Sequence, residues 1–240
     1  MEHTYLMAMA LILSAALSIE AYKLQCLTKG GAVASFLVGG FVGVFSSINA
    51  FFLLTVFTIA GFAATLKDFD KKAQEGVQEG KHGERTWKNV LGVGLPPCIA
   101  VAMDYLGLLS PDQFAIMFIS TITVAGADTI ASEIGVKDQK VYMITDFKRV
   151  EPGVNGGISV LGTSVSTVAA LLIALLGWGV ITESLDILLL IPFIAGVAGN
   201  LLDSVFGAVL ENPGYISKYT NNCSTALIGA FIGLGIYALI

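Results

Sequence analysis

Long uncharged stretches separated by short polar ones run through the whole chain. Many of these stretches approach the ~20 apolar residues that a helix needs to cross a bilayer. We expect eight transmembrane helices, at residues 5–21, 31–45, 50–66, 90–109, 113–131, 158–180, 187–210 and 224–240. The predicted fold class is therefore all-α, a polytopic integral membrane protein with one transmembrane domain over residues 1–240.

The stretch between Lys29 and Lys67 decides the number of helices. It holds 37 residues without a charge, which is too long for a single span of ~20 residues. The polar patch at 46–49 is the natural place for a turn. We therefore divide this stretch into two short helices.

The basic residues are distributed on one side of the predicted membrane. With eight helices, the loops at 22–30, 67–89, 132–157 and 211–223 share a side, and they contain all 13 Lys and Arg residues. The positive-inside rule assigns that side to the cytoplasm. Both termini should then lie outside, and the main cytoplasmic loops are those at about 67–89, 132–157 and 211–223.

The composition supports a membrane protein and limits its partners. The chain is 55% hydrophobic and only 13% charged, whereas soluble domains carry about 25% charged residues. The lipid bilayer is therefore an expected partner, and we expect the plasma membrane of a prokaryote. The net charge of −5 argues against a nucleic acid partner.

Two aspartates inside predicted helices are the strongest functional signals. Asp128 and Asp203 fall near the cytoplasmic ends of their helices, and a charge at the centre of a span costs roughly 2.5–3.5 kcal/mol. Two carboxylates at one face can hold Mg²⁺ against a polyphosphate. We expect both to be catalytic metal ligands, with Glu133 as a third ligand at the water boundary. The alternative is structural, through hydrogen bonds between helices or neutralisation by Lys.

A glycine-rich segment leads into the sixth predicted helix. Glycines allow close backbone approach to phosphate, and helix N-termini bind anions. The expected phosphate-binding residues are Gly153, Asn155, Gly156, Gly157, Ser159 and Thr163. The alternative is an ordinary reverse turn, with Ser159 and Thr163 capping the helix.

Two further polar segments are candidates for contact with phosphate. Arg85, expected to be catalytic, lies with Lys81 and Asn89 just before the fourth predicted helix, and Asn221 and Asn222 precede the last one. Basic side chains can clamp phosphates. The alternatives are contact with anionic lipid for the basic segment and helix capping for the asparagines.

Several short segments, in the order in which they occur along the chain, resemble one known family. They are GERTWKNVLGVG (83–94), ADTIASEIG (127–135), PGVNGGISVLGT (152–163), GNLLDSVFGA (199–208) and the pair Asn221-Asn222. Together they are similar to the integral-membrane prenyl-phosphate kinases of the phytyl-phosphate kinase and transmembrane protein 19 type. They resemble the phytol and dolichol kinases and the CDP-diacylglycerol synthases more distantly.

The resemblance implies a reaction and its components. A nucleoside triphosphate, typically CTP, would donate its γ-phosphoryl group to an isoprenoid monophosphate, with Mg²⁺ or Mn²⁺ as the metal. The active site would face the cytoplasm. The alternative functions are a CTP-dependent prenol kinase, a lipid cytidylyltransferase and a membrane transporter. The protein could also form a homo-oligomer.

Overall fold

Helices form most of the protein, whose computed structural model describes residues 2–74, 76, 78, 80 and 82–240. The expected phosphate-binding residue Lys81 lies outside this described part. Eight long helices are α1 (Glu2–Lys23), α2 (Lys29–Phe45), α3 (Ile48–Leu66), α5 (Trp87–Tyr105), α6 (Pro111–Gly135), α7 (Val160–Thr182), α8 (Leu190–Phe206) and α9 (Lys218–Tyr237). Each falls on one of the eight apolar segments, so the prediction of a mainly helical chain is confirmed.

Short elements occupy the loops between the long helices. They are the helix α4 (Phe69–Gln74), the 3₁₀ turn η1 (Ile187–Leu189), the π-helical turn η2 (Gly207–Glu211) and the strands β1 (Val141–Met143), β2 (Arg149–Val150) and β3 (Gly157–Ile158). The strands form an antiparallel sheet of order β2-β1-β3. This sheet was not predicted, because strands of two or three residues leave almost no alternating pattern in a polar loop.

Among the described residues, five helical segments are long and apolar enough to cross a membrane. They are Thr4–Lys23, Ile48–Leu66, Pro111–Gly135, Val160–Thr182 and Ile187–Glu211. The apolar helix α2 has 17 residues, or about 25 Å at 1.5 Å per residue, slightly less than a hydrocarbon core of about 30 Å. Helices α5 and α9 carry more polar residues at their starts. Eight spans with both termini outside therefore stay a prediction.

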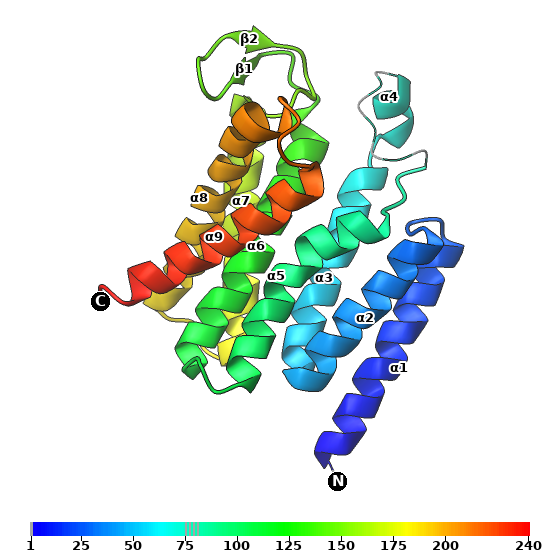
Figure 1. The fold of residues 1–240 in the computed structure, drawn as a ribbon, viewed down its shortest axis with the longest axis vertical. Helices are drawn as coiled ribbons and strands as arrows, with labels where there is room; N and C mark the ends of the chain where they lie inside the picture. The colour runs from blue at the N-terminus through cyan, green and yellow to red at the C-terminus, as the bar shows by residue number, and fades with distance from the viewer. Residues whose placement is uncertain (1, 75, 77, 79, 81) are drawn as a thin grey trace.

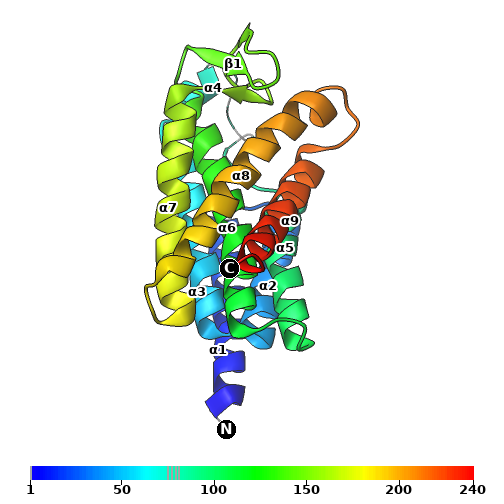
Figure 2. The same ribbon diagram turned by 90° about the vertical axis from the view of Figure 1, so that its left-hand side faces the viewer.

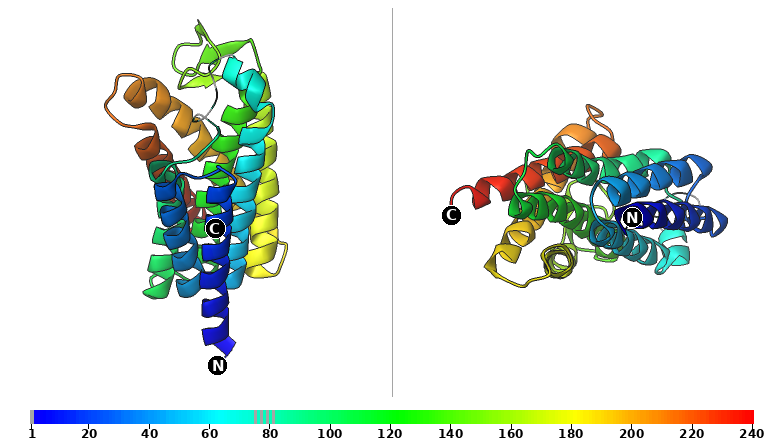
Figure 3. Two further views of the ribbon diagram at one scale, coloured as in Figure 1. Left: turned by 90° about the vertical axis from the view of Figure 1, so that its right-hand side faces the viewer. Right: turned by 90° about the horizontal axis from the view of Figure 1, so that it is seen from below.

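Helix α6 is the central element of the fold. All its residues from Phe114 to Ala127 are buried, so the helix is enclosed on every side over this length. It packs against α3, α5, α7, α8 and α9 (Figure 2). In contrast, α1 packs mainly on α2 at the edge of the bundle, and its N-terminal end extends beyond the other helices (Figure 3).

The polar loops gather at one end of the bundle, where α4 and the small sheet lie (Figure 1). The N-terminus lies at the opposite end. Lys137, which follows α6, forms an ion pair with Asp68 between α3 and α4, and this hydrogen bond lowers the pKa of Asp68. This ion pair therefore connects the segment after α6 to the segment between α3 and α4.

The turn expected at residues 46–49 is confirmed. Helix α2 ends at Phe45, and Ser47 caps α3 by accepting a hydrogen bond from the backbone N–H of Ala50 at 3.1 Å. Serine at this position satisfies one of the unpaired N–H groups of a helix start. The 37-residue uncharged stretch is thus a hairpin of two helices.

The orientation across the membrane can be tested by labelling single cysteines, after replacing Cys26, Cys98 and Cys223. Leu108 and Leu185 are exposed at the end of the bundle opposite the polar loops, and Phe147 and Tyr215 are exposed at the loop end. Cysteines at the first pair should react with an impermeant maleimide on intact cells. Cysteines at the second pair should react only after permeabilisation. The reverse pattern would contradict the predicted orientation.

Candidate functional site

A polar cavity of about 540 Å³ lies at the loop end of the bundle. Its walls come from α6, α8 with η2, the segment 152–159, and the first turns of α7 and α9. A volume of this size is typical of small-molecule sites. The cavity brings together segments that are far apart in the sequence, from Arg85 to Asn222.

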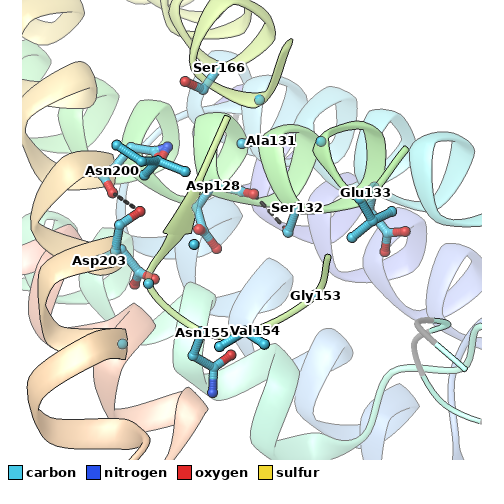
Figure 4. A pocket seen from close by; sticks show the side chains of 18 of the residues that line it. Asp128, Ala131, Ser132, Glu133, Gly153, Val154, Asn155, Ser166, Asn200 and Asp203 are labelled. Atoms are coloured by element: carbon cyan, nitrogen blue, oxygen red, sulfur yellow. Dashed lines mark hydrogen bonds between the residues drawn. The ribbon is translucent and has the colours of Figure 1, made fainter. Parts of the chain in front are cut away.

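Asp128 on α6 and Asp203 on α8 both line this cavity. Their helices pack against each other, and both side chains are half-buried. Figure 4 shows the two carboxylates turned toward the same space, above the loop that carries Asn155. The structure thus brings together the two aspartates that the sequence singled out.

Residues of α9 hold the carboxylate of Asp203 in place. Thr225 Oγ1 donates a hydrogen bond to Asp203 Oδ2 at 2.9 Å, and Asn221 Nδ2 donates to Oδ1 at 3.2 Å. Asn221 also donates to the backbone carbonyl of Asp203 at 3.1 Å and is 1% exposed. The expected ligand residue Asn221 therefore acts as a buried support for Asp203, whereas Asn222 lines the cavity.

Glu211 lines the cavity together with Asp128, Glu133 and Asp203, and sequence reasoning missed it. Asn155 Nδ2 donates to Glu211 Oε1 at 2.8 Å, and Asn221 Nδ2 lies 3.4 Å from Oε2. Glu211 ends the π-helical turn η2, and π-turns inside α-helices occur frequently at functional sites. In the sequence, Glu211 directly follows the predicted helix 187–210 and precedes Asn212-Pro213. Its spacing of eight from Asp203 was the available signal.

The glycine-rich segment packs on α8 as well as lining the cavity. Gly156 has φ +79°, and a Cβ there would lie 2.6 Å from Ala208 Cβ and 2.8 Å from the Ser204 carbonyl oxygen. Gly157 would similarly meet Val141. Close packing within the protein therefore explains why glycine occupies positions 156 and 157. Gly153, Asn155, Gly156 and Gly157 also border the cavity, and their expected binding of phosphate stays a prediction.

Ser159 and Thr163 lie at the start of α7, and both line the cavity. Ser159 caps the helix by accepting a hydrogen bond from the N–H of Gly162 at 3.0 Å. Thr163 is exposed. The capping alternative therefore accounts for Ser159, and Thr163 is the hydroxyl of this pair that remains accessible to a ligand.

Glu133 has a different set of partners from the one expected for a metal ligand. Its side chain is 8% exposed. Lys72 Nζ donates to Oε2 at 2.6 Å, and Arg85 Nη2 and Thr65 Oγ1 donate to Oε1 at 3.0 and 2.7 Å. Both carboxylate oxygens are thus engaged by cationic donors. This arrangement favours a structural role over the expected metal-binding role.

Arg85 is fixed by its backbone as well as by Glu133. Its N–H donates to the carbonyl of Cys26 at 2.8 Å, and its own carbonyl accepts from the N–H of Thr28 at 3.1 Å. Gly31 makes this possible, because a Cβ there would lie 2.4 Å from the Arg85 carbonyl oxygen. The guanidinium group therefore reaches the rim of the polar cavity from a rigid position.

Asn89 and Lys218 have positions that differ from what the sequence predicted. Asn89 accepts hydrogen bonds from the backbone and hydroxyl of Thr86 at 2.9 and 2.7 Å, which makes it part of the capping of α5. It lies outside the polar cavity lining. Lys218 at the start of α9 does line the cavity. Sequence reasoning missed it, although it is the only basic residue in the loop 211–223.

The cavity offers oxygen ligands and cationic groups side by side. Within the described residues no group of three or more His, Cys, Asp and Glu side chains is arranged to hold a metal by itself. A pair of carboxylates is nevertheless what Mg²⁺ commonly takes from a protein, with water and substrate phosphates completing its shell. The arrangement is therefore suited to a charged, phosphate-bearing ligand.

The buried ion pairs of Glu133 lead to a stability prediction. Glu133→Gln keeps the shape of the side chain but leaves Lys72 and Arg85 without their carboxylate, and breaking a buried pair costs about 3–5 kcal/mol. Thermal unfolding in detergent should show a clear fall in Tm, and Lys72→Met should show the same. The matched control is Glu151→Gln, at an exposed position. An unchanged Tm combined with weaker dependence of stability on added Mg²⁺ would instead support a metal ligand.

Comparison with known proteins places the chain in a family. The model of the integral membrane protein family DUF92 matches residues 12–231. No solved structure matches the chain.

Relatives occur in archaea and plants. The chain is 30% identical over 238 residues to an uncharacterized membrane protein, MJ0933, of Methanocaldococcus jannaschii, covering 99% of this chain and 97% of the relative. It is 31% identical over 231 residues to Protein PGR of Arabidopsis thaliana, covering 87% and 80%. It is 28% identical over 214 residues to the chloroplastic Protein VTE6 of the same plant, covering 86% and 63%. The chain therefore belongs to the DUF92 family of integral membrane proteins.

Proposed function

We propose that the protein is a membrane-embedded kinase that transfers the γ-phosphoryl group of CTP, or of another nucleoside triphosphate, to an isoprenoid monophosphate of the phytyl or geranylgeranyl type. The product is the isoprenoid diphosphate. The observation that carries the proposal is the meeting of Asp128 and Asp203 in one polar cavity at the loop end of the bundle. The resemblance of five ordered segments to prenyl-phosphate kinases supports the choice of donor and acceptor.

The residues around the two aspartates fit a divalent metal. Asp128 and Asp203 provide hard oxygen ligands, which Mg²⁺ and Mn²⁺ prefer. Asn221 Oδ1 is buried beside Asp203 and has no hydrogen-bond partner within the part that the structure describes. When bound there, Mg²⁺ or Mn²⁺ would neutralise charge on the triphosphate. Asp128 and Asp203 are the residues that would hold it.

The remaining polar groups of the cavity are suited to phosphate. Arg85 and Lys218 bring positive charge to its rim, and Asn155, Thr163 and Asn222 bring amide and hydroxyl groups. Phosphoryl transfer requires positioning and charge stabilisation more than covalent chemistry. We assign these five residues to the triphosphate and the acceptor phosphate. Lys81 remains a further candidate.

The proposed reaction needs no strong base. An oxygen of the acceptor monophosphate attacks the γ-phosphorus, and the bond from that phosphorus to the β-phosphate oxygen breaks, so that the nucleoside diphosphate leaves. A monophosphate is largely ionised near pH 7. The protein must then hold two anionic groups in line, which the cationic rim and the aspartate-bound metal would allow.

The position of the cavity favours a kinase at a membrane surface. The polar cavity lies at the end of the bundle where the long loops meet (Figure 1), whereas transporters commonly place polar sites near the bilayer midplane. We infer that this end faces the cytoplasm, in a prokaryote at the plasma membrane. The nucleotide would enter from the cytoplasm while the lipid acceptor stays in the bilayer.

The test of function uses purified protein in nanodiscs with CTP and geranylgeranyl monophosphate. The γ-label of CTP should move to the lipid, and the α-label should stay on the released nucleotide. Transfer of the α-label would identify a cytidylyltransferase. Transfer to geranylgeraniol alone would identify a prenol kinase, and transfer of neither label would contradict the proposal.

The aspartates can be tested in the same assay. Asp128→Asn and Asp203→Asn keep shape but remove the charge that would hold the metal, so kcat/KM should fall by at least about 10²-fold. The Tm of Asp128→Asn should stay near that of the wild type, because Asp128 faces the cavity. Asp203→Asn should lower the Tm slightly, because Asp203 accepts hydrogen bonds from Thr225 and Asn221. Asp70→Asn, at an exposed position outside the cavity, is the control. Near-normal turnover in Asp128→Asn at low Mg²⁺ would reject its assigned role.

A further inference from the structure

A second cavity, of about 450 Å³, lies between α1, α2, α3 and α5. These helices lie on the side of the bundle that carries the N-terminus, and within this group α3 also packs on α7 (Figure 1). Its lining is mainly apolar, with side chains such as Leu17, Val38, Phe51, Leu54 and Val93. We call it the apolar groove.

The apolar groove is continuous with the polar cavity. Four residues line both, namely Arg85, Thr129, Lys218 and Asn222. Two of them are basic, and they stand where an apolar space meets a polar one. A molecule filling both spaces would therefore have an anionic group next to a long apolar group.

The shape of the groove suits an extended chain. Along α3 its lining runs from Phe51 to Ala63, which corresponds to about 18 Å of helix at 1.5 Å per residue. The end far from the polar loops is closed, because α1 and α2 pack tightly there. A Cβ on Gly39 would lie 2.6 Å from Ser14 Oγ, and one on Gly43 would lie 2.5 Å from Ala10 Cβ.

The groove also opens to the outer surface of the bundle. Ile59 and Leu24 belong to its lining and are 58% and 72% exposed. Helix α1 packs closely on α2 but has few contacts with α3. A lipid could therefore enter sideways from the bilayer without leaving the membrane.

We propose that the apolar groove binds the hydrocarbon tail of an isoprenoid monophosphate from the bilayer, with its phosphate between Arg85 and Lys218, and that the closed end of the groove selects the tail length. This inference rests on the proposed function for the identity of the acceptor. The tail site itself rests on the lining and on its continuity with the polar cavity. Anchoring of the tail would place the phosphate at the boundary of the cavity that holds Asp128.

The groove can be shortened without touching the polar cavity. Thr55 lies one turn from Phe51 and lines only the apolar groove, so Thr55→Trp should fill its closed part. The kcat/KM for geranylgeranyl monophosphate should fall by about tenfold or more, while that for geranyl monophosphate should change by less than about twofold. The matched control is Leu172→Trp, on the exposed face of α7, which should affect neither acceptor.

A binding measurement separates this inference from the reaction. Geranylgeranyl monophosphate carrying a diazirine at the end of its tail is irradiated with the protein in nanodiscs, and labelled peptides are identified by mass spectrometry. We expect label on α1 and α3 near Ser14 and Phe51, and loss of that label in Thr55→Trp. Label in the groove without phosphoryl transfer would retain the tail site and reject the kinase. Phosphoryl transfer with label spread over the outer faces of α7 and α8, and unchanged tail preference in Thr55→Trp, would overturn the tail site.

Discussion

Placing carboxylates within apolar helices is the constraint on which the structure depends, because an unpaired charge there is costly. The protein meets this constraint in three different ways. Glu133 is neutralised by Lys72 and Arg85, and Asp203 is held by hydrogen bonds from Thr225 and Asn221. Asp128 faces the polar cavity. The first solution ties the loop 67–89 to α6, and the other two leave a pair of acidic groups at the polar cavity.

The two cavities form an amphiphilic site between two halves of the bundle. Helices α6 and α8 carry the acidic groups, whereas α1, α2, α3 and α5 surround the apolar groove. Arg85 links the halves, because its backbone is bonded to the segment after α1 and its side chain to Glu133 on α6. A change at Glu133 should therefore affect the position of Arg85 as well as stability.

The sequence predicted features that depend on local patterns, and it missed those that depend on packing. Helix positions, the turn at Ser47 and the cavity positions of Asp128 and Asp203 follow from apolar runs and isolated charges. The buried pair of Lys72 with Glu133 could not be predicted, because the two residues are 61 positions apart and each resembles an ordinary loop charge. Glu211 was missed because its one sequence signal, the spacing of eight from Asp203, does not reveal the π-turn that places it. Gly156 was assigned to phosphate approach, although its close neighbours belong to α8.

The central claim is that Asp128 and Asp203 together hold one divalent ion with the nucleotide. Electron paramagnetic resonance of Mn²⁺ measures this directly, with the protein in nanodiscs and a β,γ-methylene analogue of CTP. The wild type should bind a single Mn²⁺ in the presence of the analogue. Asp128→Asn and Asp203→Asn should each weaken that binding, and the double variant should lose little more, because both side chains share the same ion. Mn²⁺ binding that is unchanged in either single variant would contradict the account.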